Sequence, residues 1–406
     1  MYIFCTLIFL HFLTVFHIFA AAIWNLARMI VKPIKTIMIM KTRNLLMLLL
    51  LAMMPLAASA YDFEVDGLYY EKTGEGEVKV THKDARCSYD GAADVVVPSE
   101  ITVDGSVYKV KTIGILAFAE ATDAPHLKSV TLSEGIERIE TVAFTGARYL
   151  TKVVLPSTLR YIGSQAFVGC RSLKEVSLPE GLEEIDYMAF SQCGLTSLVI
   201  PSTVRKIGFS VLGDSPVKEL SVAEGNAWYD SRENCQAIVE TATNTLIQGT
   251  AATCIPADVT AIDKRAFYMM KLESLTIPAG IKEIGDEAFG NNWRTLSSVY
   301  CYSEVPVGSG HGLFTFLTSS DFVLTLYVPK GCSDAYRAHP EWGLFPEIKE
   351  FDPKNEASPT GIGAAETGEA GVEACFSADG KRLQAPVRGL NIVRMSDGTT
   401  KKVVMK

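Results

Sequence analysis

The chain has 406 residues, of which 48% are hydrophobic and 21% are charged, and its formal net charge is −8. The first 60 residues carry five basic and no acidic side chains, so the remainder of the chain carries a charge of −13. Binding to nucleic acid or to anionic lipid requires an excess of Lys and Arg. Neither is therefore expected as a partner.

Two apolar segments lie at the N-terminus. Residues 40–60 have a basic start at Met40, an uninterrupted apolar run and small residues at 58–60, a pattern typical of a secretory signal peptide. The earlier apolar segment, residues 3–23, is long enough to span a bilayer. Residues 1–39 are therefore either an over-extended start of the reading frame or a membrane anchor. The complete signal peptide at residues 40–60 favours the first.

Residues 61–94 alternate apolar and polar side chains, as at Val78-Lys79-Val80. This alternation predicts strands with one buried face. Because a repeat array follows and needs its end covered, these residues are expected to form a β-rich N-terminal cap.

Residues 95–351 contain two alternating motifs. The first, Leu-x-x-Val-x-Leu or a close variant, often with Pro after it, starts at Leu127, Leu150, Leu173, Leu195, Val217 and Leu272. The first five starts are 22 or 23 residues apart. The second motif, Ile-x-x-x-Ala-Phe, ends at Phe144, Phe167, Phe190, Phe267 and Phe289. The first predicts a short strand that Pro ends, because Pro cannot donate to a ladder. The second is compatible with one helical or 3₁₀ turn.

Neither motif can bury its apolar side alone, so the coils are expected to stack with their strands parallel and about 4.8 Å apart. The spacing predicts two buried columns, one of Leu155, Leu178, Ile200 and Val222 and one of Phe144, Phe167 and Phe190. The positions between the buried strand residues, such as Val154, Ser177 and Val199, are small or β-branched. They predict a flat, exposed ladder without converging ionisable groups.

The alternation of the two motifs resembles the BspA-type leucine-rich repeats of bacterial surface proteins, over roughly residues 90–330. The resemblance implies a leucine-rich-repeat solenoid, and it implies contact with host matrix proteins or other cells. The chain departs from the general leucine-rich repeat because Ser, Thr or Gly replaces the Asn ladder after the strand. That departure leaves the usual horseshoe curvature open.

Two segments interrupt the period, and they predict where a ligand binds. Residues 226–251 predict a β-hairpin that bulges from one coil, and residues 303–321 are rich in Gly and Ser. Segments outside the period are free of the packing constraint, and aromatic side chains commonly anchor contacts. The candidate binding residues are Trp228, Tyr229, Tyr300, Tyr302 and His311. For Trp228 the alternative is packing at a coil junction. Residues 335–348, with Trp342, are expected to close the solenoid.

Motifs that carry catalysis are missing from the sequence. It contains no His-Glu-x-x-His zinc motif, no phosphate-binding GxxxxGK[ST] loop and no Gly-x-Ser-x-Gly elbow. We therefore expect no catalytic residue, metal, cofactor or small-molecule substrate. Eight cysteines follow the signal peptide without a CxxC pair, and Cys170 and Cys193 occupy matching repeat positions. Buried free thiols are favoured for them over disulfides or a metal site.

The C-terminal residues predict a linker and a small module. Residues 352–374 are rich in Gly, Ala, Glu, Pro and Thr, a composition typical of a linker. Residues 375–406 contain Asp379-Gly380 and Asp397-Gly398 between apolar stretches, which predict hairpins. With Gly-Leu-x-Ile-Val-Arg from residue 389, this tail resembles the C-terminal sorting signal of type IX secretion. The resemblance implies the secretion machinery as a partner and a location on or outside a Gram-negative cell.

These features together predict a secreted or surface-displayed protein for binding or adhesion, which contacts host proteins, glycans or other cells. The alternative is a non-catalytic structural component of the outer surface or an inhibitor. An enzyme that uses the array as a scaffold is a lesser alternative.

Overall fold

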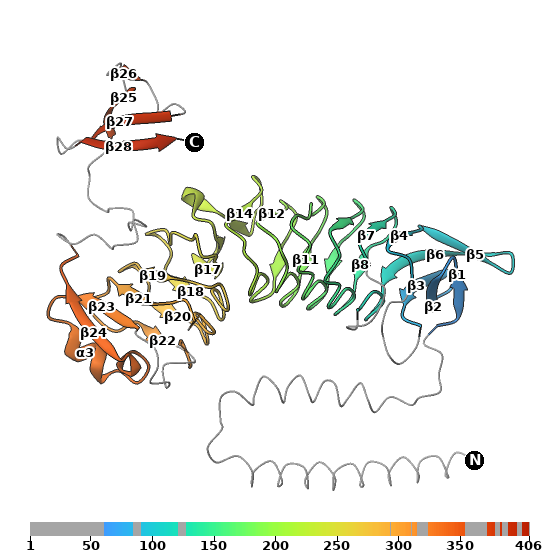
Figure 1. Ribbon diagram of the computed structural model, residues 1–406, viewed down its shortest axis with the longest axis horizontal. Helices are drawn as coiled ribbons and strands as arrows, with labels where there is room; N and C mark the ends of the chain where they lie inside the picture. The colour runs from blue at the N-terminus through green and yellow to red at the C-terminus, as the bar shows by residue number, and fades with distance from the viewer. Residues whose placement is uncertain are drawn as a thin grey trace, which may run out of the picture. The chain divides into compact units, whose positions relative to one another are not determined.

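The computed structural model describes residues 61–83, 91–120, 127–292, 294–309, 311–314 and 324–353, and four strands between 372 and 405. The chain divides into two units, residues 1–58 and 59–406. The first unit lies outside the described residues, and with it lie the predictions of an anchor or over-extended start and of a signal peptide. The second unit contains a β-solenoid, whose stacked coils are visible in Figure 1.

The solenoid begins with a sheet of longer strands. Strands β1 (Phe63–Val65), β2 (Leu68–Gly74) and β3 (Glu77–Thr81) pair antiparallel in sequence. Strand β6 (Ser106–Ile113) pairs parallel with β3 and antiparallel with β5 (Glu100–Val103). Tyr70, Val78 and Val80 are almost fully buried, because this sheet covers the core of the first coil.

The first motif of each repeat supplies one row of parallel strands. This row starts with β4 (Asp94–Val97), β7 (Ser129–Leu132) and β9 (Lys152–Val154), and continues with β12 (Ser197–Ile200) and β14 (Glu219–Val222). Further along are β19 (Ser274–Ile277), β21 (Ser298–Cys301), β23 (Thr325–Pro329) and β24 (Glu347–Phe351). Matching residues of neighbouring repeats are paired in register, as Val130 with Val153. The predicted solenoid of short parallel strands is confirmed.

The Ile of the second motif lies in a second row of parallel strands, which the sequence did not predict. Each strand has two residues: β8 (Arg138–Ile139), β10 (Tyr161–Ile162), β11 (Glu184–Ile185), β13 (Lys206–Ile207), β18 (Ala261–Ile262), β20 (Glu283–Ile284) and β22 (Gly308–Ser309). Figure 1 shows β8 and β11 of this row apart from β7, β12 and β14 of the first.

The turn after each of these strands differs from the expected helical or 3₁₀ turn. The third residue after the Ile has a positive φ in successive coils, 54° at Val142, 56° at Gln165 and 53° at Met188. A left-handed residue cannot continue a right-handed 3₁₀ helix, so the chain forms a tight non-helical turn there. In the described solenoid, helix is confined to η1 (Arg232–Asn234), α3 (Ser333–Ala338) and η2 (Trp342–Leu344).

Stacked phenylalanine rings run through the core, as predicted. Phe118, Phe144, Phe167 and Phe190 are fully buried. Neighbouring ring centroids are 4.9 to 5.3 Å apart, with interplanar angles of 3° to 6°. Each ring covers the face of the next, so the column links the stability of successive coils.

The buried slot that follows each Phe is a hydrogen-bonding position and not merely an apolar filler. The Sγ atoms of Cys170 and Cys193 lie 3.3 and 3.1 Å from the Phe carbonyl oxygens of the preceding coils. Ser215 Oγ donates to the carbonyl of Phe190 at 2.7 Å. In a later coil, Asn292 Nδ2 donates to the carbonyl oxygen of Phe267 at 2.7 Å. Six cysteines whose side chains are described are free thiols, and Cys170, Cys193, Cys235 and Cys301 are buried as predicted, whereas Cys254 and Cys332 are partly exposed.

Aromatic side chains close the far end of the solenoid. Trp342 is fully buried, and its Nε1 donates to the carbonyl oxygen of Val307 at 3.1 Å. The hydroxyl of Tyr336, on α3, donates to the carbonyl of Ser303 at 2.9 Å. These contacts cover the last coils with side chains whose polar atoms are satisfied.

The C-terminal residues form a separate four-stranded sheet. Strand β25 (Val372–Ser377) pairs antiparallel with β26 (Arg382–Leu383) and β27 (Gly389–Met395), and β27 pairs with β28 (Thr400–Met405). The two Asp-Gly pairs lie between the strands β25 and β26 and between β27 and β28. Most of the predicted linker, residues 352–374, lies outside the described residues.

Candidate binding groove

The first interruption of the period is part of the core and does not bulge from the coil as expected. Strands β15 (Tyr229–Asp230), β16 (Ile238–Glu240) and β17 (Thr245–Gln248) form an antiparallel meander, and β17 continues the solenoid ladder by pairing parallel with β18. Ala237, Ile238, Val239 and Leu246 are fully buried. The meander replaces a regular coil, because its two apolar runs fill the same interior.

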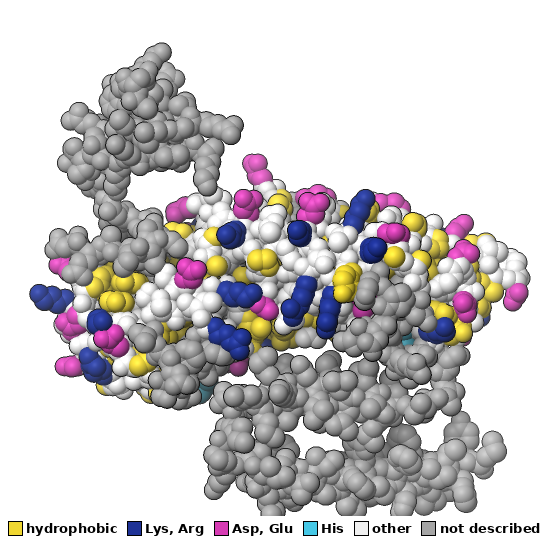
Figure 2. Space-filling view, viewed as in Figure 1, with side chains coloured by type: hydrophobic (Ala, Val, Ile, Leu, Met, Phe, Trp, Pro, Cys, Tyr) yellow, Lys and Arg dark blue, Asp and Glu magenta, His cyan; other side chains and the backbone are white. Residues whose placement is uncertain are grey.

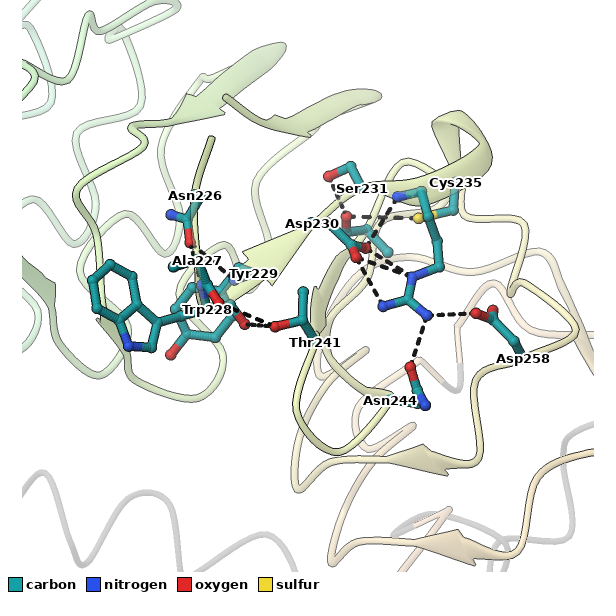
Figure 3. A network of polar contacts seen from close by, with 12 residues as sticks. Asn226, Ala227, Trp228, Tyr229, Asp230, Ser231, Cys235, Thr241, Asn244 and Asp258 are labelled. Atoms are coloured by element: carbon teal, nitrogen blue, oxygen red, sulfur yellow. Dashed lines mark hydrogen bonds and ion pairs between the residues drawn. The ribbon is translucent and has the colours of Figure 1, made fainter. Parts of the chain in front are cut away.

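Trp228 and Tyr229, which are drawn in Figure 3, differ in exposure. The Trp228 side chain is 45% exposed, whereas Tyr229 is 6% exposed and its hydroxyl lies 3.4 Å from the Arg205 carbonyl. Burial raises the pKa of Tyr229. Asn226 fixes the turn, because its Oδ1 accepts hydrogen bonds from the backbone N–H groups of Trp228 and Tyr229, at 2.8 and 2.9 Å. Of this pair, Trp228 alone is available to a ligand.

A charged network next to this turn fastens the meander to the following coil. The Arg232 guanidinium donates to Asp230 at 2.8 Å, to Asn244 at 2.7 Å and to Asp258. The partners of this network are seen in Figure 3. Hydrogen bonding to Asp230 is the main cause that raises the pKa of Arg232, so its charge is held in place. The network satisfies its own members and is structural.

The three candidates near the second interruption differ in exposure. Tyr300 is 5% exposed and stacks on Tyr327 at 4.4 Å, and burial raises its pKa to about 12. Tyr302 is half-buried against Phe351. The side chain of His311 is exposed, and its backbone N–H donates to Asp286 at 2.7 Å. Tyr300 is therefore a core residue, and Tyr302 and His311 remain candidates.

The row of first-motif strands is not the flat ladder that the sequence predicts. Residues 174–178 of the third repeat form no strand, although they carry the same motif as their neighbours. Among the described strands, β9 pairs with β7 alone and β12 with β14 alone. Between β9 and β12 the surface opens into a groove of about 720 Å³.

This strand-face groove is lined by backbone edges, hydroxyls, aliphatic side chains and a few charges. The lining comprises Thr151, Lys152, Val153, Val154, Leu155, Glu175, Val176, Ser177, Leu178, Glu180, Ser197, Leu198, Val199 and Pro201. Val154 is 39% and Val199 is 56% exposed. The groove therefore offers apolar contact beside hydrogen-bonding groups.

The groove also corrects the predicted aliphatic column. Ile200 is fully buried, but Leu155, Leu178 and Val222 are only partly buried. For Leu155 and Leu178 the reason is that residues 174–178 leave the ladder and uncover the inward side of the strand row. The third motif keeps the apolar pattern of the second, Leu150 to Pro156. Its Lys-Glu-x-Ser residues recur at 218–221, where β14 forms a strand, so the sequence contains no signal that would have revealed the groove.

The two ends of the strand row differ in charge. Exposed lysines lie where the strands begin, at Lys128, Lys152, Lys174 and Lys218, with Glu175 and Glu219 among them. Exposed glutamates follow the strand ends, at Glu134, Glu180 and Glu224. The Glu134 carboxylate accepts the backbone N–H and the hydroxyl of Ser157, which lowers its pKa. Figure 2 shows basic and acidic side chains interspersed on the visible face, with hydrophobic ones between them.

The groove is suited to binding. Its ionisable side chains, Lys152, Glu175 and Glu180, are exposed to water and can contact a ligand from solution. Within the described ranges, no group of three His, Cys, Asp or Glu side chains could hold a metal ion. No helix of the described chain has the length and apolar character to cross a membrane.

Stacked repeats with two rows of parallel strands define this protein as a β-solenoid, and its strand face carries an open groove. Six copies of the BspA-type leucine-rich repeat region match residues 100–217 and 247–309. Residues 100–217 and 247–309 are therefore BspA-type leucine-rich repeats. No curated protein matches the chain.

Several solved structures are similar. A leucine-rich repeat protein from Bacteroides ovatus is 19% identical, with a TM-score of 0.47, over 72% of this chain and 77% of its own. The pneumococcal vaccine antigen PcpA is 16% identical, with a TM-score of 0.41, over 70% of this chain and 96% of its own. A leucine-rich cell surface protein from Faecalibacterium prausnitzii is 16% identical, with a TM-score of 0.39, over 77% and 100% of the two chains.

Proposed function

We propose that this protein is exported and acts outside the cell or at its surface as a non-catalytic binding protein. Its ligand is a protein or glycan of a host or of another cell. The observation that carries the proposal is the strand-face groove, an open site with aliphatic and hydrogen-bonding groups on a rigid repeat scaffold. The exposed ring of Trp228 is a second candidate contact, since aromatic side chains anchor many interfaces.

The experiment uses residues 61–406, immobilised and exposed to purified extracellular-matrix proteins and mucin glycans. Val154→Lys and Val199→Lys place charge in the groove, and Trp228→Ala removes the exposed ring. Val107→Lys is the matched control, because Val107 is 53% exposed on β6, away from the groove. Capture that is lost in the groove variants and kept in the control supports the proposal. If no ligand is captured, or if all variants capture equally, the proposed site is wrong.

Export is tested separately. The tail from residue 376 resembles a sorting signal, and its strands pair among themselves. Deletion of residues 376–406 is expected to leave a folded solenoid in the periplasm of the cell that makes it. Surface exposure or release at the level of the intact chain would show that the tail is not a sorting signal.

A further inference from the structure

The backbone on both sides of the strand-face groove is open to pairing. Strand β9 pairs with β7 and β12 pairs with β14, and across the groove neither has a strand partner in the described sheets. The segment 174–178 lies between the two strands in sequence. The N–H of Thr196 donates to the carbonyl oxygen of Lys174, and the described residues show no backbone hydrogen bond between 175–178 and either strand. An unpaired strand edge is a template for another extended chain, because its N–H and C=O groups need partners.

Aliphatic side chains in the groove are incompletely covered at alternate positions. Val176 and Leu178 are partly buried, whereas Leu198 and Ile200, which match them in the next repeat, are 2% and 0% exposed. Leu155, on the other wall, is also partly buried. Successive side chains of an extended chain point to opposite faces, so residues two apart in a ligand would cover Val176 and Leu178.

The charges at the two ends of the groove favour one arrangement of charges in the ligand. Lys152 and Glu180 line the groove, one where the strand row begins and the other where it ends, and Lys174 lies next to Glu175 outside the lining. Glu175 lies beside the lysines, so the beginning carries two positive charges against one negative. An acidic side chain would be favoured at the lysine end of the groove and a basic one at the glutamate end.

We infer that the strand-face groove binds an extended polypeptide segment, which adds a strand along the edge of β9 or β12. The segment has aliphatic side chains two residues apart, with an acidic residue at one end and a basic residue at the other. Recognition of this kind takes its affinity from main-chain hydrogen bonds and its specificity from pockets for alternate side chains. The groove lining contains no aromatic ring on which a sugar could stack, which favours a peptide over a glycan. The inference rests on the proposed binding function and names its ligand.

The experiment selects from a random 12-residue peptide library on immobilised residues 61–406. Enriched peptides are expected to contain the aliphatic pair between opposite charges. A selected peptide is then synthesised in two N-methylated forms, each methylated at alternate residues. One form should bind about tenfold more weakly, because it loses main-chain hydrogen bonds to the strand edge, and the other should bind as before. Val199→Lys should abolish binding, and Val107→Lys should not.

Four outcomes would overturn the inference. The first is a library from which no peptide is enriched, and the second is binding that neither methylated form weakens. The third is a groove that mucin glycans occupy and that no selected peptide does. The fourth is a dimer of the chain that Val199→Lys dissociates. The last would make a second copy the occupant. If no peptide is enriched while Val199→Lys still abolishes capture of a matrix protein or glycan, the peptide inference fails and the proposed binding function stands.

Discussion

Replacement of Phe167 by Ala tests whether the ring column holds the solenoid together. Phe167 is fully buried, and its ring stacks between Phe144 at 4.9 Å and Phe190 at 5.3 Å. Truncation of a buried Phe costs about 3–5 kcal/mol in transfer and cavity terms. An aromatic contact contributes about 0.5–1.5 kcal/mol beyond burial, and two are lost here. The free energy of unfolding should therefore fall by an amount in the upper part of the 3–5 kcal/mol range.

The assay is urea unfolding of residues 61–406, followed by circular dichroism. Val199→Ala is the control, since that side chain is 56% exposed and its loss should change stability by less than about 0.5 kcal/mol. Because each coil contacts its neighbours alone, amide hydrogen exchange should lose most protection in the coils around Phe167. A loss below about 1 kcal/mol, or uniform exchange along the chain, would refute the column as the element that couples the coils.

Three further predictions concern individual polar groups. Ser215→Ala leaves the Phe190 carbonyl without its donor at 2.7 Å and should cost about 1–3 kcal/mol in urea unfolding, whereas Ser215→Cys should cost less because the thiol can still donate. If both variants lost the same free energy of unfolding, the hydrogen bond to the Phe190 carbonyl would not be the reason for the loss. Arg232→Lys should lower the free energy of unfolding by about 1–2 kcal/mol, because an ammonium cannot reproduce the guanidinium fork to its carboxylate partners, among them Asp258. An unchanged urea midpoint would show that the network contributes nothing. Tyr70 is buried, and desolvation is the main cause that raises its pKa. Below the pKa of about 10 that tyrosine has in the unfolded chain, the neutral side chain therefore stabilises the folded state. That contribution is lost as the pH rises toward the pKa of Tyr70 in the folded protein. Between about pH 9 and 11 the free energy of unfolding of Tyr70→Phe should therefore fall less than that of the parent. Parallel plots of the two free energies against pH would contradict this.

The repeat spacing by itself determined the solenoid and most of its core. Phe144, Phe167 and Phe190 recur at one position of a period of 22 or 23 residues, and in the structure they form one stacked column. This could be predicted because the inward or outward direction of a side chain follows from its place in a short strand or turn. That direction is a local property, and the repeat multiplies it along the chain.

The tertiary structure alone decided the surfaces that a ligand can reach. Tyr229 and Trp228 are adjacent and both aromatic, but one packs against the preceding coil and the other faces solvent. Residues 174–178 carry the motif of their neighbours, yet they leave the ladder and open the strand-face groove. Burial of a single ring and pairing of a single strand depend on contacts between coils that are distant in sequence. A motif that is the same in every repeat cannot specify where one repeat departs from the others.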